Sequence, residues 1–226
     1  MKNKNNDAYL ITSVLKKNGF EAFYAGGCVR DFLLKKQPKD YDIATSALPD
    51  EIEKLFDRTN SIGKKFGTIG VLINESLIEV TTFRSDETYL DGRHPTNITF
   101  TSPDKDAERR DFTINGLFMN PDTLEIVDFV DGQDDLKKRI VKAIGDPDHR
   151  FSEDHLRMLR AVRFAHTLDF DLDHETYKAI KKNAHKISVV SVERIENELS
   201  RILIESQKPG DALQTLHDIG LLEYIL

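Results

Sequence analysis

The spacing of apolar residues divides the chain into a first part of short strands and a second part of helices. Up to about residue 131, apolar residues alternate with polar ones or form short runs bounded by glycine, proline and asparagine, which is typical of strands. Beyond that point they recur every three or four positions, which predicts helices. The pattern predicts strands near residues 21–25, 40–45, 68–73, 77–83 and 97–101, and a hairpin over 117–130. It predicts helices near residues 7–18, 28–36, 49–56, 132–138, 152–168, 173–185, 191–206 and 209–218.

Two aspartates in the predicted strand DYDIAT indicate metal chemistry. Asp40 and Asp42 are two residues apart, and such positions point to the same face of a strand. At about 6 Å and an effective dielectric of about 20 the two carboxylates repel each other by about 3 kcal/mol, so a site that holds them normally holds a cation or a proton as well. Oxygen ligands without cysteine or histidine favour Mg²⁺ over zinc. Glu79, a carboxylate in an apolar strand, is the obvious further ligand, and it is equally compatible with a solvent-facing strand residue. The aspartate pair alone is also compatible with a strand end and a turn.

Two adjacent glycines, Gly26 and Gly27, separate a predicted strand from a predicted helix. Backbone without side chains can approach a phosphate closely, and the free N–H groups at the start of a helix attract anions. Arg30, one turn into the helix, would add a charged donor. The glycines are not part of a Walker loop, because no Gly-Lys-Ser or Gly-Lys-Thr follows. On their own they are also compatible with an ordinary turn.

Two further stretches combine arginines with an acid or an amide. The first, RRDFTIN, contains Arg109, Arg110, Asp111 and Asn115. The second is the predicted helix 152–168, with Ser152 as its N-cap, whose broad polar face carries Asp154, Arg157, Arg160 and Arg163 at three-residue spacing. Both stretches are also compatible with solvent-exposed faces that form weak ion pairs.

The pair formed by Asp154 and Arg157 offers a means of choosing a base. A carboxylate accepts a hydrogen bond from an exocyclic amine, and a guanidinium donates one to the neighbouring ring nitrogen, so the pair matches the Watson–Crick edges of cytosine and adenine. Uracil and guanine would leave polar groups unpaired, at about 1–3 kcal/mol each. We therefore expect a preference for CTP and ATP.

Composition restricts the possible settings. The 226 residues are 39% hydrophobic and 31% charged, and they contain no apolar run long enough to span a membrane and no signal-peptide pattern. The single cysteine, Cys28, excludes an internal disulfide and fits a reducing cytoplasm. A net charge of −7 is the opposite of a general nucleic-acid footprint, so any nucleic-acid contact is expected at a local basic patch.

Taken together, the carboxylates, the glycine turn and the arginines describe a nucleoside triphosphate held by its phosphates beside a two-metal centre. Such a centre activates a hydroxyl for attack on the α-phosphorus and neutralises charge on the departing pyrophosphate. The residues therefore predict nucleotidyl transfer.

Six stretches, taken in order, also match the motifs of a known family. They are GGCVRD (26–31), DYD (40–42), IEVTTFR (78–84), RRDFTING (109–116), DGQDDLKKRIVKAIG (131–145) and EDHLR (153–157). From about residue 20 onwards the chain resembles the class II tRNA nucleotidyltransferases, which belong with bacterial poly(A) polymerase to the polymerase-beta-like nucleotidyltransferase superfamily. The resemblance implies an α+β protein. Residues 1–135 would form a nucleotidyltransferase head with a mixed sheet of about five strands, and residues 136–226 an all-α neck with the beginning of a body.

The resemblance also implies template-independent addition of C, C and A to tRNA 3′ ends, with two Mg²⁺ ions. It assigns catalysis to Asp40, Asp42, Glu79 and Arg110, with the metal on Asp40 and Asp42. It assigns nucleotide contacts to Gly26, Gly27, Arg30, Arg110, Asp111, Asn115, Asp154, Arg157, Arg160 and Arg163.

A polar stretch, residues 84–96, resembles the flexible loop that members of the family need for adding the terminal A. It carries Asp86, Tyr89 and Arg93, and it makes CCA addition the first hypothesis and A-only addition the second. Family members usually continue for more than a hundred further residues that grip tRNA, so we expect a truncated chain to keep nucleotide binding and lose tRNA affinity.

Three other functions remain open. A poly(A) polymerase shares nearly all these motifs. A non-catalytic nucleotide- or RNA-binding domain on a decayed enzyme fold is opposed by the intact set Asp40, Asp42, Glu79 and Arg110. A small-molecule nucleotidyltransferase would need neither the pair Asp154 and Arg157 nor the loop.

Overall fold

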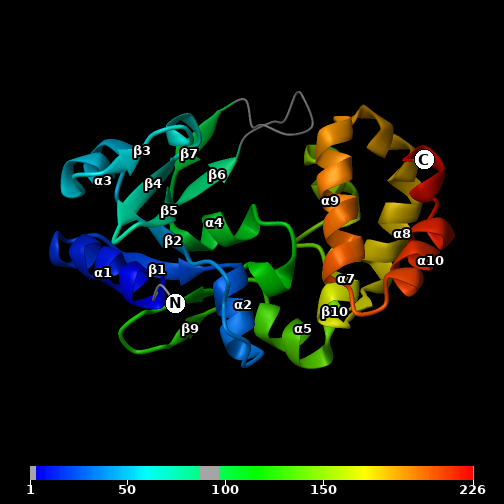
Figure 1. The fold of residues 1–226 in the computed structure, drawn as a ribbon, viewed down its shortest axis with the longest axis horizontal. Helices are drawn as coiled ribbons and strands as arrows, with labels where there is room; N and C mark the ends of the chain where they lie inside the picture. The colour runs from blue at the N-terminus through cyan, green and yellow to red at the C-terminus, as the bar shows by residue number, and fades with distance from the viewer. Residues whose placement is uncertain (1–3, 87–96, 226) are drawn as a thin grey trace. The chain divides into compact units, whose positions relative to one another are not determined.

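The structure is a computed structural model that describes residues 4–86 and 97–225. The described chain divides into two compact units (Figure 1). Unit 1 comprises residues 4–86, 97–110 and 115–132, and unit 2 comprises residues 111–114 and 133–225. Unit 1 contains the main sheet and unit 2 is mostly helical, which confirms the predicted α+β class.

Unit 1 is built on a seven-stranded mixed sheet with the order β3-β4-β5-β2-β1-β8-β9. The strands are β1 (Ala22–Ala25), β2 (Asp42–Thr45), β3 (Thr59–Asn60), β4 (Thr68–Ile73), β5 (Ser76–Thr82), β8 (Phe118–Met119) and β9 (Ile126–Val127). Strands β2 and β5 are parallel, and the other neighbours in this sheet are antiparallel. The sheet has more than the expected five strands, because the hairpin predicted over 117–130 adds β8 and β9. The sequence pattern does not predict strand β3, because two residues are too short for a periodic signal. The predicted strand near 97–101 instead pairs outside this sheet, as β7 (Ile98–Phe100) with β6 (Arg84–Asp86).

The register of the strands fixes which side chains share a face. Ala25 pairs with Asp42, and Tyr24 pairs with both Ile43 and Met119. Because paired residues point to the same side and consecutive ones alternate, Asp42 and Tyr24 lie on opposite faces. Buried side chains cover the Asp42 face beside the carboxylate: Ala25, Ala44, Phe83, Ala107 and Phe118.

Four helices accompany this sheet. They are α1 (Lys4–Lys17), α2 (Gly27–Leu33), α3 (Pro49–Leu55) and α4 (Pro103–Glu108). Helix α1 contacts β1, β2 and β5, and helix α4 supplies Ala107 to the cluster on the Asp42 face. Proline in the first turn starts α3 and α4, since a missing N–H costs nothing there.

Unit 2 consists mainly of helices, seen in green to red in Figure 1. They are α5 (Gly132–Lys138), α6 (Pro147–Glu153), α7 (Leu156–Leu168), α8 (His174–Asn183), α9 (Val192–Glu205) and α10 (Pro209–Asp218). A short parallel pair, β10 (Ile140–Val141) and β11 (Asp171–Leu172), accompanies them. Helix α7 packs against α9 and α10, and its Phe164 meets Phe112 edge to face at 5.7 Å. None of the helices that the structure describes is long and apolar enough to cross a membrane.

The prediction of one helix over 152–168, capped by Ser152, is wrong. Helix α6 starts earlier, because the Asp146 side chain accepts a hydrogen bond from the His149 N–H at 2.9 Å and Pro147 follows the cap. The helix then stops at Asp154, whose backbone is extended and whose carboxylate accepts from the Leu156 N–H at 3.0 Å. A side-chain bond of this kind competes with helical pairing and separates α6 from α7.

Candidate active site

The carboxylates of unit 1 meet across β2 and β5. Asp42 is the first residue of β2, and it is in register with Glu79 on the parallel neighbour β5, so the two side chains share a face. Asp40 lies two residues before the strand begins, which differs from the prediction that both aspartates belong to it. The pair that the sheet itself aligns is therefore Asp42 with Glu79.

The surroundings of Asp42 disfavour its ionised form. Its pKa is raised to about 6, first because the surrounding protein removes water from the carboxylate and second because Glu79 lies close. Arg110 opposes the rise, and Asp40 adds to it. Asp42 is exposed to solvent. Its carboxylate is therefore desolvated by neighbouring protein atoms and not by complete burial. A positive charge placed here would relieve the repulsion among the carboxylates.

The donor set fits a hard divalent cation. Asp42, Glu79 and Asp40 offer only carboxylate oxygens, the ligands that such ions prefer. Within residues 4–86 and 97–225, no three histidine, cysteine or acidic side chains are already grouped closely enough to hold an ion. Mg²⁺ in proteins commonly takes one or two carboxylates together with phosphate oxygens.

Arg110 is the cation that lowers the pKa of Asp42, and a buried acid orients it. Its Nε and Nη2 donate to one oxygen of Asp106 at 3.2 and 2.9 Å, and its guanidinium lies 5.0 Å from the centre of the Phe118 ring. The other oxygen of Asp106 accepts from Arg109 at 2.9 and 2.7 Å. Asp106 is 1% exposed, and its two carboxylate oxygens hold the guanidinium groups of both arginines in place.

Sequence reasoning missed Asp106, although a signal was present. Asp106 precedes Arg109 and Arg110 by three and four residues in the segment DAERR. At these spacings side chains on a helix are neighbours, and α4 extends almost to the arginines. The spacing alone therefore indicates a buried acid that presents two arginines.

The glycine turn lies where β1 passes into α2. Gly26 has a φ of +71°, which only glycine adopts without strain, and a Cβ there would come within 3.0 Å of Arg110 Nη1. Arg30 donates to Asp31 at 2.9 and 2.7 Å and to the Asn115 side chain at 2.7 Å. Unit 1 thus brings Arg30 and Asn115 together, and Gly26 and Arg110 together.

The remaining nucleotide candidates belong to unit 2, where each is tied to a protein partner. Asp111 accepts from Arg160 at 2.9 and 2.5 Å. Arg163 is 3% exposed and donates to Glu198 of α9 at 2.5 Å. Asp154 and Arg157 do not pair with each other.

The two candidates for base selection have other partners instead. Asp154 binds Arg194 at 2.7 Å, whereas Arg157 contacts Glu153 and donates to the Arg150 carbonyl oxygen at 3.0 Å. The expected side-by-side presentation therefore differs from the arrangement in the structure, because the helix breaks at Asp154.

The loop candidates are only partly described. Asp86 belongs to β6 and lies 3.1 Å from Arg84 Nε and 3.8 Å from Arg109 Nη1. Tyr89 and Arg93 lie outside the described residues.

Two protein-family models match parts of this chain. Residues 22–142 match the model of the poly A polymerase head domain, and residues 169–226 match the model described as "Probable RNA and SrmB- binding site of polymerase A". The chain is 45% identical over 215 residues to the CCA-adding enzyme of Limosilactobacillus reuteri, covering 95% of this chain and 53% of that one. It is 41% identical over 217 residues to the CCA-adding enzyme of Staphylococcus aureus, covering 95% and 54%.

Solved structures agree with the sequence comparisons. The CCA-adding enzyme of Bacillus stearothermophilus in complex with CTP superposes with a TM-score of 0.88 at 39% identity, covering 98% of this chain and 53% of that one. A tRNA nucleotidyltransferase complexed with a primer tRNA and an ATP analogue superposes with a TM-score of 0.80 at 28% identity, covering 96% and 62%. The chain spans about half the length of the curated relatives it matches. These matches confirm the resemblance drawn from the motifs, and the chain belongs to the poly A polymerase head domain family.

Proposed function

We propose that this chain carries the catalytic part of a tRNA nucleotidyltransferase that adds C, C and A to tRNA 3′ ends from CTP and ATP. The observation that carries the proposal is the alignment of Asp42 with Glu79 near Arg110, on one face of the sheet. Relatives over 40% identical are named CCA-adding enzymes. Residues 1–135 would form the catalytic head, and residues 136–226 the neck and the beginning of a body.

The family uses a divalent metal, and we assign Mg²⁺ with two ions to the carboxylates Asp40 and Asp42, supported by Glu79. When bound, Mg²⁺ supplies Lewis-acid activation of the attacking hydroxyl and neutralises phosphate charge. The protein's own part is to hold the carboxylates ionised and aligned. Arg110 assists, because it lowers the pKa of Asp42 against the effects of water removal and Glu79.

The nucleotide contacts are assigned to residues of both units. In unit 1 the backbone at Gly26 and Gly27, with Arg30, Arg110 and Asn115, would receive the triphosphate and the sugar. In unit 2 Asp111, Arg160 and Arg163 are assigned to the nucleotide, and Asp154 and Arg157 to the base. In the structure Asp154 is paired with Arg194, and Arg157 is paired with Glu153. Base selection therefore requires both side chains to leave these partners and bind the Watson–Crick edge of the base. We place the reaction in the cytoplasm, which fits a chain with one cysteine.

The test is incubation with tRNA that lacks its CCA end, with CTP and ATP supplied separately and together, followed by sequencing of the products. Addition of CC from CTP alone and of CCA from both nucleotides is the expected result. If the chain adds only a terminal A to tRNA ending in CC, the second hypothesis of A-only addition holds. If the chain adds CCA, deletion of residues 86–93 should abolish ATP incorporation and spare CTP incorporation, and equal loss of both would contradict the role assigned to the loop.

Poly(A) polymerase is the second candidate, favoured by the name of the matching head-domain model. It predicts that addition continues with ATP beyond a single A. A non-catalytic binding domain is the candidate of another class, and it predicts that Asp42→Ala leaves every addition product unchanged.

A further inference from the structure

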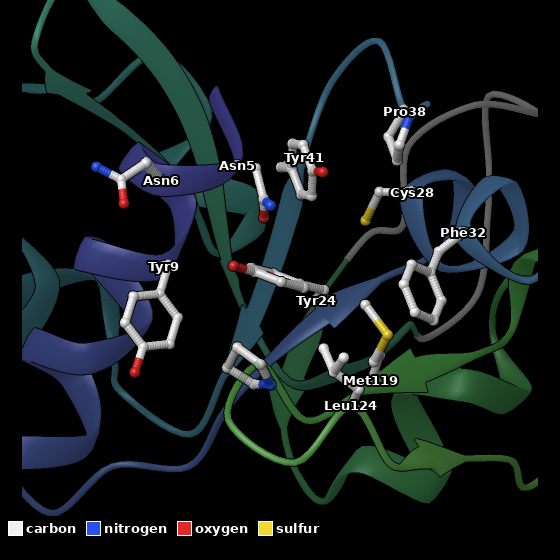
Figure 2. A pocket seen from close by; sticks show the side chains of 11 residues that line it. Asn5, Asn6, Tyr9, Tyr24, Cys28, Phe32, Pro38, Tyr41, Met119 and Leu124 are labelled. Carbon is white, nitrogen blue, oxygen red and sulfur yellow. The ribbon is translucent and has the colours of Figure 1, made fainter. Parts of the chain in front are cut away.

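A cavity of about 290 Å³ lies in unit 1, away from the carboxylates. It is enclosed by the first turns of α1, by β1 and α2, by the segment before β2 and by the region around β8 (Figure 2). Tyr24 stands among the other lining side chains, and its partners across the sheet are Ile43 and Met119. The cavity is therefore on the face opposite Asp42 and is a separate site.

Among the residues that the structure describes, the lining contains no charged side chain. Its 11 residues are asparagine, tyrosine, phenylalanine, proline, leucine, methionine and cysteine, in a chain in which 31% of residues are charged. A charged ligand would lose hydration here without gaining a counter-charge, which is costly. The cavity thus selects an uncharged molecule.

The walls are predominantly aromatic and sulfur-bearing. Tyr24 and Tyr41 meet edge to face at 5.3 Å, and Tyr9 and Phe32 line other parts of the wall. Met119 adds a thioether, which packs well against rings. Aromatic rings prefer offset or edge-to-face contact with another ring, so a planar aromatic ligand gains most from these walls. The volume suits a one- or two-ring molecule, since it lies at the lower end of ligand cavities.

Tyr24 provides the polar group that would orient such a ligand. Tyr24 as a whole is 3% exposed, but its hydroxyl is not one of the fully buried polar atoms without a partner among the described residues, so it is open to solvent in the cavity. A ligand acceptor would take the place of water at this hydroxyl. Water removal raises the pKa of Tyr24, so the hydroxyl keeps its proton and remains a donor.

We propose that this cavity is a binding site for a small, uncharged, planar aromatic molecule that carries a hydrogen-bond acceptor facing the Tyr24 hydroxyl. The site is on the other face of the sheet from the Asp42 carboxylate, and it touches β1 and the residue before β2.

The test uses the whole chain with ¹³C-labelled methionine methyl groups and quinoline as the probe. The chain has three methionines, of which Met119 lines the cavity and Met158 is buried in unit 2 as an internal reference. Quinoline is uncharged near neutral pH and has one ring nitrogen acceptor. A saturable shift of the Met119 signal with an unmoved Met158 signal is expected. Quinoline-6-carboxylate, its anionic counterpart, should bind at least about tenfold more weakly, because nothing in the lining offsets its charge.

Variants separate the site from general surface binding. Tyr24→Phe keeps the ring and removes the hydroxyl, so the Kd for quinoline should rise about three- to tenfold. Phe32→Ala removes part of a wall at a side chain that is 42% exposed and should also weaken binding. Leu77→Ala is the matched control, because Leu77 is an exposed apolar residue of unit 1 outside the cavity, and it should leave the Kd unchanged. An unmoved Met119 signal, equal binding of the carboxylate, or an unchanged Kd in Tyr24→Phe overturns the proposal.

Discussion

Asp106 shows how one buried side chain can organise charges that the sequence presents as a simple run. Burial alone would raise the pKa of its carboxyl, but Arg110 and Arg109 outweigh burial and lower the pKa. The acid is thus ionised and bound to both guanidinium groups. Because Arg110 in turn acts on Asp42, Asp106 is a positioning residue for the candidate active site.

Replacing Asp106 with asparagine should destabilise the protein and slow nucleotide addition. Asparagine cannot satisfy two guanidinium groups, and breaking a buried ion pair of this kind costs about 3 kcal/mol of the free energy of unfolding. Urea unfolding and single-turnover CTP addition to tRNA would measure the two effects. Asp134→Asn is the control, since its exposed pair with Lys137 should be worth less than about 1 kcal/mol. Equal losses in both variants would contradict the role of Asp106.

Replacing Asp42 with asparagine should slow nucleotide addition without destabilising the protein. Its raised pKa means that the ionised carboxylate is held against repulsion and loss of water, so Asp42→Asn should leave the free energy of unfolding unchanged or increase it. Addition should fall by at least about a hundredfold, the upper range for loss of a group that supports a metal site. Denaturant unfolding and addition assays on the same preparation test this. A variant that loses stability and activity together would assign Asp42 a structural role instead.

At the scale of elements, the turn from β1 into α2 joins the glycine motif to the arginines. Gly26 needs its positive φ to end the strand, and its Cα faces Arg110 so closely that a Cβ would lie 3.0 Å from the guanidinium nitrogen. The turn therefore holds backbone and arginine in van der Waals contact. This contact is lost if either group is displaced.

Gly26→Ala should consequently impair addition more than it impairs folding. A positive φ costs alanine about 1 kcal/mol, and the extra methyl group would push Arg110 away. Gly19→Ala isolates the first effect, because Gly19 has a φ of +87° and a Cβ added there would meet no atom within 4 Å. Both variants should unfold at lower denaturant, Gly26→Ala by more because its φ of +71° and ψ of −126° lie outside the left-handed helical region. Only Gly26→Ala should raise the KM for CTP. Similar KM values in the two variants would show that the close approach has no function.

Local patterns predicted most elements correctly, and the failures have a common cause. The strand, glycine turn and helix over residues 21–36 follow from neighbouring residues, and so do the ends of α9 and α10. The break between α6 and α7 depends on which backbone donor the Asp154 carboxylate accepts from. The pairing of Asp154 with Arg194 joins residues 40 apart in sequence, and helical periodicity contains no information about such a contact. The assignment of Asp42 and Glu79 to one site depends on a contact of the same kind, the parallel pairing of β2 with β5. Its premise, a carboxylate in an apolar setting, is wrong for Glu79, which is exposed.

At the scale of the whole molecule, the described chain divides into two compact units. In unit 2 a buried ion pair ties two long helices together: Arg163 of α7, 3% exposed, donates to Glu198 of α9, 5% exposed. Loss of water lowers the pKa of Arg163, and Glu198 is the main charge that opposes this effect. Glu198 is thus the main counter-charge of this buried guanidinium, and Glu205 lies 3.8 Å from its Nη1.

Glu198→Gln should therefore unfold unit 2 at lower denaturant while unit 1 keeps its stability. Removing the carboxylate leaves a buried guanidinium without its main counter-charge, which costs about 3–5 kcal/mol. Native-state hydrogen exchange should show faster exchange at amides of α7 and α9, and unchanged exchange at amides of β1, β2 and β5. Glu205→Gln is the matched control, because Glu205 lies 3.8 Å from the same arginine and its side chain is 28% exposed. Acceleration of exchange by the same factor in both units would mean that the chain unfolds as one cooperative body, and that the ion pair stabilises all of it.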